Sequence, residues 1–292
     1  MLPGPAFQNQ PQLVGGGAPT RPPLDDLNGY QLVHLVATKI DWERFGVDPG
    51  VIPGNCQRVK GRFQPFYGSR SESVAIVGYG KSLVETWEQI KQFPIIFSCS
   101  GSHNFLLERG IVPTYHVESD PGKHKVPLLG TPHPDVTYLI ASICHPTYFD
   151  LLERHSIPKL LLWHLLFLEP HIYALYPRGE WLMTGGNTVG PRTMKMARLL
   201  GYTEQHIFGF DGSTGYAADH PNTPKRLKGC EYDGKMYETT YNWLEHAKMM
   251  FTDMDRMAEV KAHFYGEGLI QAMAKNYVRK GVHDYPMGII KT

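Results

Sequence analysis

The stretch from Met183 to Asp211, MTGGNTVGPRTMKMARLLGYTEQHIFGFD, indicates an α/β fold, because it combines a glycine-rich turn, an amphipathic helix and a strand. Apolar residues recur with helical spacing from Val189 to Leu200, and Gly201 is expected to end the helix. The apolar run 206–210 then predicts a buried strand that leads directly into Asp211. Because ligands of open α/β sheets lie beyond the carboxyl ends of strands, Asp211 is a site candidate by position.

The start of this helix is a predicted anion site. Gly185 and Gly186 allow the backbone to approach a ligand closely, and Asn187 and Thr188 can cap the free N–H groups of the first turn. Helix N-termini favour negative groups such as phosphate. The opposite side of the helix is expected to carry its charges, at Arg192, Lys195 and Arg198.

Composition excludes several classes of function. The 292 residues include 29 Lys and Arg against 28 Asp and Glu, so no strong field attracts nucleic acid or an anionic membrane. No apolar run approaches the roughly 20 residues that span a bilayer, and no basic segment followed by an apolar one marks a signal peptide. The four cysteines form no CxxC pair, which favours reduced thiols in a cytoplasmic protein over a disulfide or zinc framework.

Three regions are expected along the chain. Residues 1–29 are rich in Pro, Gly and Gln and predict a mobile or surface-hugging tail, a candidate contact for a protein partner. Residues 30–72 have an irregular pattern and are interpreted as an N-terminal extension. Residues 73–292 alternate apolar runs with helical stretches, which predicts an α/β domain. Its mostly parallel sheet would carry helices on both faces.

The expected strands of this domain are 74–77, 95–98, 114–118, 136–142, 159–163, 206–210 and 260–264. Asp233-Gly234 predicts a small hairpin over 229–237. A long helix is expected from Glu238 to about Asp255, and 165–176 is compatible with a helix lining a pocket. The Gly/Pro-rich loop 212–224 is long enough to indicate a functional loop.

A second glycine turn follows the strand 74–77. Residues 75–82, AIVGYGKS, fit a loose phosphate-loop pattern, but Ile76 and Val77 look like buried strand and leave too few residues for the wide loop. The dinucleotide fingerprint is also incomplete, because Leu83 stands in the third glycine's place. The pattern that remains is a tight turn at Gly78, Gly80, Lys81 and Ser82. It leads into a helix N-terminus, which can bind phosphate.

Other strand ends add candidate groups. Asp120, which follows the strand 114–118, and Asp211 are two carboxylates that can hold Mg²⁺ together with substrate phosphates. Alternatively, Asp120 only caps the turn before Pro121-Gly122. His145, after Ser142, is either a substrate contact or a structural residue. In the long loop, His220 is either a lid residue or a solvated one.

Together these segments resemble the family of 6-hydroxymethylpterin diphosphokinase (MptE-like) proteins, whose domain is shared by the motility accessory factors that glycosylate flagellin. The resemblance runs from about Ser73 to Met273. It is carried by the segments IVGYGKSL (76–83), LERGIVP (107–113), VESDP (117–121), ASICHP (141–146), GGNTV (185–189), ARLLG (197–201), FGFD (208–211), YA (216–217) and GEGLI (266–270). Lys81 replaces the family's proline, and Asn187 replaces its serine.

The resemblance implies a Rossmann-like, sialyltransferase-related fold that binds a nucleotide across the strand ends. It implies nucleotide contacts from Gly78, Gly80, Lys81, Ser82, Ser119, Ser142, Gly185, Gly186, Asn187, Thr188 and Tyr216, catalytic roles for Asp120, Asp211, His145 and His220, and Mg²⁺ on Asp120 and Asp211. Some members transfer diphosphate from ATP to a pterin alcohol with Mg²⁺. Others use a CMP-activated nonulosonic sugar, for which His145 or His220 would serve as general acid or base.

Three functional hypotheses follow. The first is a diphosphokinase-like transferase that uses ATP, Mg²⁺ and a small-molecule alcohol acceptor. The second is a glycosyltransferase that uses a CMP-sugar. The third is a nucleotide-binding accessory protein without catalysis, because a fold does not by itself imply an activity.

Overall fold

The computed structural model describes residues 48–66, 68–167, 170–183, 188–218, 220, 223–224, 226–279 and 289–291. The predicted tail, residues 30–47 of the predicted extension, and Gly185, Gly186 and Asn187 lie outside these residues.

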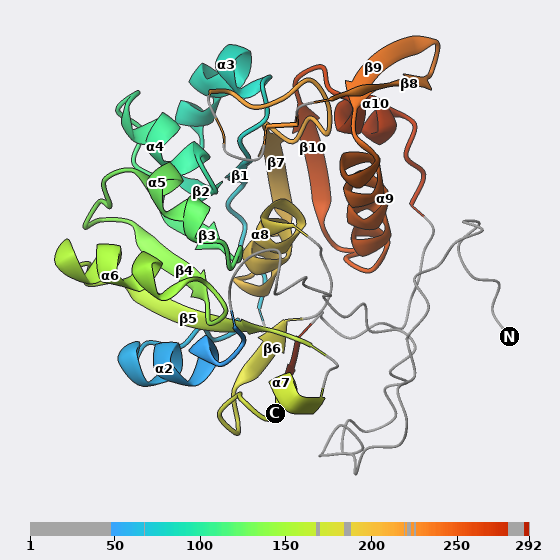
Figure 1. The fold of residues 1–292 in the computed structure, drawn as a ribbon. Helices are drawn as coiled ribbons and strands as arrows, with labels where there is room; N and C mark the ends of the chain where they lie inside the picture. Colours follow the sequence, from blue (N-terminus) through green and yellow to red (C-terminus); the bar gives the residue numbers. More distant parts are fainter. Residues whose placement is uncertain are drawn as a thin grey trace, which may run out of the picture.

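A nine-stranded sheet dominates the described part of the chain (Figure 1). Its order is β10-β7-β1-β2-β3-β4-β5-β6-β11, and every neighbouring pair is parallel except β6 with β11. This confirms the predicted mostly parallel α/β sheet. The strands are β1 (Val74–Val77), β2 (Ile95–Cys99), β3 (Tyr115–Glu118), β4 (Thr137–Ala141), β5 (Leu160–Leu165), β6 (Trp181–Met183), β7 (Glu204–Phe208), β10 (Lys261–Tyr265) and β11 (Ile289–Lys291).

Helices connect these strands and cover both faces of the sheet (Figure 1). The helices are α2 (Val51–Arg58), α3 (Leu83–Thr86), the 3-10 helix η3 (Trp87–Gln92), α4 (Ser102–Leu107), η4 (Lys123–Lys125), α5 (Val126–Leu129), α6 (Pro146–Arg154), α7 (Pro170–Tyr173), α8 (Val189–Leu199), α9 (Tyr241–Asp255) and α10 (Leu269–Lys275). The helix that was expected to follow the glycine turn is thus an α-turn, α3, followed by the 3-10 segment η3.

Alternation along β1 divides the core into two layers. Ala75 and Val77 lie in a cluster with α3, η3 and α4, whereas Val74 and Ile76 lie in a larger cluster with α8 and α9. All four β1 side chains are buried, as expected for a strand covered on both faces. The larger cluster also includes Ile52 of α2, so residues that follow position 48 pack on the same core as the sheet.

The predicted hairpin is present as β8 (Lys228–Tyr232) and β9 (Lys235–Thr239). Asp233 and Gly234 both have positive φ, which is the backbone that a two-residue hairpin turn needs. Thr240 then caps α9 by accepting a hydrogen bond from the Trp243 main-chain N–H (3.1 Å). This cap explains why the helix begins three residues later than predicted.

Three sequence-based expectations differ from the structure. β7 begins at Glu204 rather than 206 and ends at Phe208, because Gly209 adopts positive φ. β6 and β11 were not predicted, since each is only three residues long. The charges of α8 do not form a solvent face, because Arg192 and Lys195 are each only 4% exposed.

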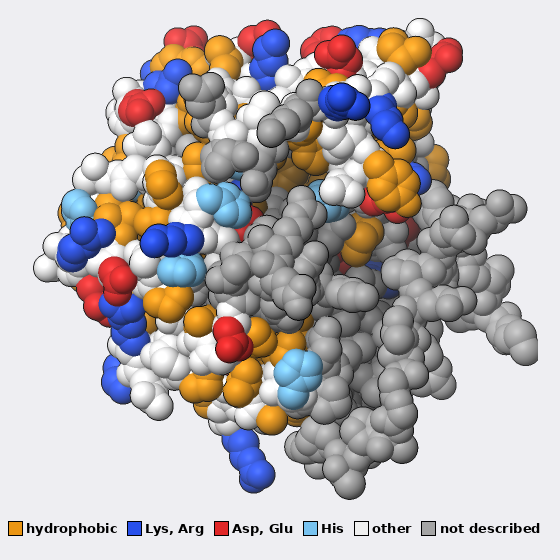
Figure 2. All heavy atoms as spheres, in the orientation of Figure 1, with side chains coloured by type: hydrophobic (Ala, Val, Ile, Leu, Met, Phe, Trp, Pro, Cys, Tyr) orange, Lys and Arg blue, Asp and Glu red, His pale blue; other side chains and the backbone are white. Residues whose placement is uncertain are grey.

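Charges of both signs are mixed over the described part of the face drawn in Figure 2, in line with the near-equal numbers of basic and acidic residues. Within the described residues, no helix combines the length and the apolar character needed to cross a bilayer.

Candidate functional site

The strand order reverses at β1, and this reversal marks the expected ligand crevice. From β1 the chain builds β2 to β6 outward on one side, and then returns to place β7 on the other side of β1. In open α/β sheets a crevice forms beyond the carboxyl ends of the strands at such a point. The loops that follow β1, β3 and β7, together with the start of α8, therefore supply the candidate groups.

Asp211 holds the glycine turn that follows β1. Its Oδ2 accepts a hydrogen bond from the Ser82 main-chain N–H (2.7 Å), and its Oδ1 accepts from the Ser82 hydroxyl and from Gln271 Nε2 (2.9 Å). Asp211 is 3% exposed. A Cβ on Gly80 would lie 2.7 Å from Asp211 Oδ2, so this close approach requires glycine.

Most N–H groups of this turn are already bonded within the protein. Gly78 and Gly80 donate to the carbonyls of Phe208 (2.8 Å) and Gly209 (2.7 Å), and Ser82 donates to Asp211. Lys81 is exposed. The turn therefore joins β1 to β7, and the phosphate-binding role of its glycines stays a prediction.

The loop after β3 is organised by a buried carboxyl group. Glu118 is 1% exposed, and its Oε1 accepts hydrogen bonds from the main-chain N–H groups of Ser119 (2.8 Å) and Asp120 (2.9 Å). Burial raises the pKa of Glu118, and the charge of Lys125 opposes that shift. Glu118 thus sets the direction in which the Ser119 and Asp120 side chains leave the strand.

The two carboxylate oxygens of Asp120 have different partners. Oδ1 accepts from the Gly122 main-chain N–H (2.8 Å), which is the turn-capping contact considered from the sequence. Oδ2 lies 3.5 Å from Lys125 Nζ, and the side chain is 21% exposed. Asp120 therefore caps its turn and still presents a carboxylate oxygen beside a buried lysine.

Arg192 belongs to the site, although the sequence predicted it only as one of the charges on the polar side of the helix. It lies in the first turn of α8, and its Nη1 donates to the Ser119 hydroxyl (2.8 Å) at the end of β3. Burial lowers the pKa of Arg192 to about 10, while Asp120 and other nearby groups favour the charged form. The guanidinium is therefore charged at neutral pH, at a helix start and among strand ends.

Thr188 occupies the N-cap position of α8, but its side chain makes no capping hydrogen bond there. One turn beyond Arg192, Lys195 Nζ lies 3.5 Å from Asp253 Oδ1 of α9, and both side chains are almost fully buried. Burial lowers the pKa of His246 in α9 to about 4, and Arg192 contributes to that shift. Lys195 is thus held in a buried ion pair between α8 and α9, which the periodicity of α8 alone does not reveal.

An aromatic group stands beside the glycine turn. The rings of Tyr216 and His220 stack at 3.8 Å, and the Tyr79 ring centroid lies 6.3 and 6.0 Å from them. A β-bridge joins Gly80 to Tyr216 and ties this loop to the turn. The long loop after β7 thus brings Tyr216 and His220, two predicted site residues, next to the turn that follows β1.

Lys125 links this aromatic group to Asp120. Its Nζ lies 3.4 Å from His220 Nε2 and 3.5 Å from Asp120 Oδ2. Burial, followed by the charges of Lys125 and His124, lowers the pKa of His220 to about 3. His220 is therefore a neutral imidazole at physiological pH.

The polar residues that follow β4, Ser142 and His145, both make hydrogen bonds within the protein. Ser142 is fully buried, and its hydroxyl lies 2.8 Å from His164 Nδ1. His145 caps α6, because its Nδ1 accepts from the Thr147 main-chain N–H (3.2 Å). Burial and Lys123 lower the pKa of His145. With Nδ1 as acceptor, neutral His145 carries its proton on Nε2 and can donate a hydrogen bond there.

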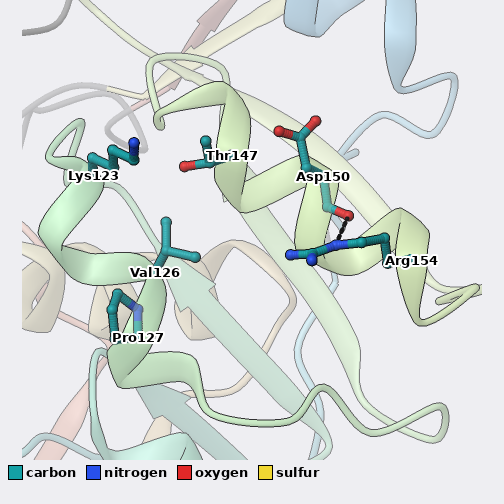
Figure 3. A pocket seen from close by; sticks show the side chains of 6 residues that line it. All are labelled: Lys123, Val126, Pro127, Thr147, Asp150 and Arg154. Atoms are coloured by element: carbon teal, nitrogen blue, oxygen red, sulfur yellow. Dashed lines mark hydrogen bonds between the residues drawn. The ribbon is translucent and has the colours of Figure 1, made fainter.

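An open hollow of about 510 Å³ lies next to the His145 cap (Figure 3). Lys123, Val126 and Pro127 line one side, and Thr147, Asp150 and Arg154 of α6 line the other. Its two sides come from segments that begin just after Asp120 and His145. The hollow is therefore a candidate place for a second substrate.

The two carboxylates predicted to hold Mg²⁺, Asp120 and Asp211, differ in how free their oxygens are. Both oxygens of Asp211 are engaged by Ser82 and Gln271, whereas Asp120 keeps Oδ2 toward Lys125 and solvent. Mg²⁺ in nucleotide sites needs one or two carboxylates plus phosphate oxygens. Asp120 fits that need, and a ligand role for Asp211 would require it to release Ser82.

Comparison with known proteins gives two kinds of result. No curated protein sequence matches the chain. Among solved structures, a Maf glycosyltransferase from Magnetospirillum magneticum AMB-1 matches over 80% of this chain and 41% of its own, with 18% identity and a TM-score of 0.56. This chain thus spans less than half of that enzyme, and the likeness shows a shared fold.

Two crystal structures of a mammalian sialyltransferase, one in complex with Gal-beta-1-3GalNAc-ortho-nitrophenol, also align over 80% of this chain. Their identities are 12% and 14%, and their TM-scores are 0.41 and 0.42. The family model described as 6-hydroxymethylpterin diphosphokinase MptE-like matches residues 52–216, more than half of the sequence, and the chain therefore belongs to the MptE-like family.

Proposed function

We propose that this protein is a nucleotide-dependent transferase whose phosphate site lies at the start of α8. The observation that carries the proposal is the buried Arg192 guanidinium, which donates to Ser119 at the end of β3. A charged arginine, a hydroxyl and the start of an eleven-residue helix offer convergent donors for an anion. Thr188 adds a hydroxyl that is not used as a cap.

The base of the nucleotide would pack against the aromatic group. Tyr79, Tyr216 and His220 present ring faces and edges beside the crevice, and aromatic rings favour offset stacking with flat ligands. The loop that carries Tyr216 and His220 follows β7 directly, so it can adjust to the ligand without disturbing the sheet.

The family description supports diphosphoryl transfer from ATP as the reaction. The acceptor's hydroxyl oxygen would bond to the β-phosphorus of ATP and release its proton to water, the bond from that phosphorus to the bridging oxygen of the α-phosphate would break, and AMP would leave. Mg²⁺ held by Asp120 and the phosphates would neutralise charge on the transferred group. Arg192 would orient the phosphates and offset charge on the leaving group.

The protein's own groups would also handle the acceptor. The hollow beside α6 would hold it, and Nε2–H of His145, which caps the same helix, is a nearby candidate donor. Neutral His220 would stay hydrogen-bonded to Lys125. Because positioning and electrostatics dominate phosphoryl transfer, no strong base is required at the acceptor hydroxyl.

A glycosyltransferase that uses a CMP-activated sugar is the second candidate. The engagement of Asp211 by Ser82 favours it, because such a reaction does not require two carboxylates on a metal ion. The same α8 start would hold the single phosphate of CMP. A third candidate, a nucleotide-binding accessory protein, predicts binding without turnover.

A thermal-shift panel of ATP, GTP, CTP, CMP and CMP-sialic acid, each with and without Mg²⁺, tests these candidates. A ligand at a hundred times its dissociation constant stabilises the fold by about 2.7 kcal/mol, which visibly raises the melting temperature. We expect the largest shift with ATP and Mg²⁺. A metal-independent shift with CMP would instead favour glycosyl transfer, and no shift with any nucleotide would contradict the proposal.

Catalysis is tested separately with Asp120→Asn. This variant should stay folded and lose ATP-dependent diphosphoryl transfer to a 6-hydroxymethylpterin acceptor. Asp135→Asn, an exposed carboxylate, is the matched control. Nucleotide binding without any turnover in the wild type would support the accessory-protein candidate.

A further inference from the structure

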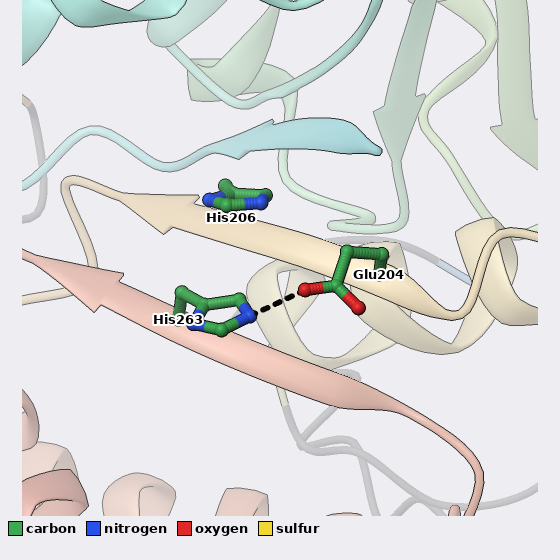
Figure 4. Close-up of side chains that lie close together, drawn as sticks. All are labelled: Glu204, His206 and His263. Atoms are coloured by element: carbon green, nitrogen blue, oxygen red, sulfur yellow. Dashed lines mark hydrogen bonds and ion pairs between the residues drawn. The ribbon is translucent and has the colours of Figure 1, made fainter. Parts of the chain in front are cut away.

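A second group of chemically active side chains lies away from the crevice, on strands β7 and β10. Glu204 and His206 are two residues apart on β7, so they point to the same face of the sheet. His263 on β10 is the register partner of His206. Figure 4 shows the three side chains close together on these two strands. β10 is the terminal strand of the sheet order, Glu204 and His206 are partly exposed, and His263 is exposed.

The three side chains converge. His263 Nε2 lies 2.6 Å from Glu204 Oε1, and the rings of His206 and His263 stack with centroids 4.7 Å apart at 20°. One ligand atom from each residue lies within 4.8 Å of the other two. Among the described residues this is the group of three His, Cys, Asp or Glu side chains close enough to hold one metal ion.

Neighbouring groups already orient His206. Its Nδ1 lies 2.8 Å from the Tyr265 hydroxyl, and Phe93 packs on the ring with centroids 4.5 Å apart. Ligating histidines usually hold their second ring nitrogen in such a hydrogen bond, which fixes the ring and leaves the other nitrogen for the metal. Tyr265 can accept from Nδ1–H, which makes Nε2 of His206 the ligand atom.

We propose that Glu204, His206 and His263 bind one divalent transition-metal ion of the zinc type. Two imidazole nitrogens and one carboxylate oxygen are a common donor set for Zn²⁺, with water as the fourth ligand. Metal–ligand bonds of about 2.0–2.2 Å place neighbouring ligand atoms of a tetrahedral site about 3.3–3.6 Å apart. The pair Glu204–His263 must open slightly to reach this spacing, and the stacked rings must tilt.

The ion would replace interactions that the group makes without it. Glu204 Oε2 lies 3.8 Å from Lys261 Nζ, but this lysine is 76% exposed and free to move into solvent. The bound ion would link β7 to β10, the strand at the end of the sheet. Such a site would stabilise this edge of the sheet, and it lies apart from the nucleotide crevice.

Isothermal titration of chelator-treated, nucleotide-free protein with ZnCl₂ tests the proposal. The wild type should bind one more equivalent of Zn²⁺ than His263→Ala and than His206→Ala. His155→Ala removes an exposed histidine at the end of α6 and should keep the wild-type stoichiometry. Tyr265→Phe should weaken the site about ten- to hundredfold, because it removes the hydrogen bond that orients His206.

Two further readouts separate coordination from loose surface binding. Co²⁺ in place of Zn²⁺ should give the visible absorption of a tetrahedral site in the wild type and lose it in His263→Ala. Zn²⁺ should raise the melting temperature of the wild type and leave that of His263→Ala unchanged. Equal stoichiometry and equal thermal shifts in the wild type, His206→Ala and His263→Ala would overturn the proposal.

Discussion

Ser82 and Asp211 are 129 positions apart in the sequence, yet the Ser82 main-chain N–H donates to Asp211 Oδ2 at 2.7 Å and the Ser82 hydroxyl donates to Oδ1. The contact joins the loop after β1 to the loop after β7, at the point where the strand order reverses. The first turn of α3 thus has a carboxylate of the protein itself at its N-terminus, where a bound anion was expected.

Asp211→Asn should lower the free energy of unfolding by about 1–3 kcal/mol. An amide oxygen can still accept from the Ser82 N–H, but the amide nitrogen leaves the Ser82 hydroxyl or Gln271 Nε2 without an acceptor. Urea unfolding measures the loss. Asp135→Asn changes an exposed carboxylate and should match the wild type; equal midpoints for all three proteins would show that Asp211 does not hold the turn.

Arg192→Lys should weaken nucleotide binding about ten- to hundredfold. Hydrogen bonds to charged groups contribute about 1.5–3 kcal/mol, and lysine cannot offer two parallel donors to a phosphate while reaching Ser119. Titration calorimetry with ATP and with CMP measures the change. Arg198→Lys is the control, because Arg198 lies on the same helix and pairs with Glu259 instead. Equal weakening by both variants would place the phosphate elsewhere.

Stability should fall as pH drops below about 6.5, because buried histidines must gain protons on unfolding. Burial lowers the pKa of His103 to about 4 and that of His164 to about 3. Between these values and the unfolded pKa near 6.5, the unfolded chain binds more protons, so acid favours it. Each histidine contributes up to about 1.4 kcal/mol per pH unit in that window.

His103→Gln tests this proton count. The hydrogen-bond partners of the His103 ring are the Leu129 carbonyl and the Tyr138 hydroxyl. Glutamine can donate to the carbonyl or accept from the hydroxyl, but it does not titrate. Urea unfolding from pH 7 to pH 4.5 should give a shallower pH dependence for the variant. Parallel curves for variant and wild type would assign the acid sensitivity to other groups.

Lys195 and Asp253 form an ion pair between α8 and α9. Removing only one partner should strongly lower the free energy of unfolding. Lys195 and Asp253 are almost fully buried, and Asp253 Oδ2 accepts no hydrogen bond from the residues that the structure describes. Asp253→Leu should destabilise by about 3–5 kcal/mol, because it leaves a buried lysine without its acid. Replacing both residues, with Lys195→Met added, should recover part of this loss, as measured by chemical unfolding.

The exposed pair Lys235 and Glu267 is the control for that experiment. Its side chains are 55% and 78% exposed, so Glu267→Gln should change stability little. If Asp253→Leu behaves like Glu267→Gln, or if the double variant is no more stable than Asp253→Leu, the pair does not contribute as described.

The sequence by itself determined the order and type of most elements. Apolar runs such as 74–77 and the helical period after Val189 reflect local geometry, which neighbouring residues dictate. Asp233-Gly234 predicted its hairpin because few residues accept positive φ. The segments quoted for the MptE-like resemblance pointed to the family that the match over 52–216 confirms.

Only the tertiary structure decided which side chains meet. Arg192 and Lys195 were expected on the charged side of the helix, yet both are buried, because burial depends on what packs around a helix. The engagement of Asp211 by Ser82, and the convergence of Glu204 and His206 with His263, depend on strand order and register between distant segments. Periodicity shows which residues share a face of an element, but long-range pairing chooses their partners.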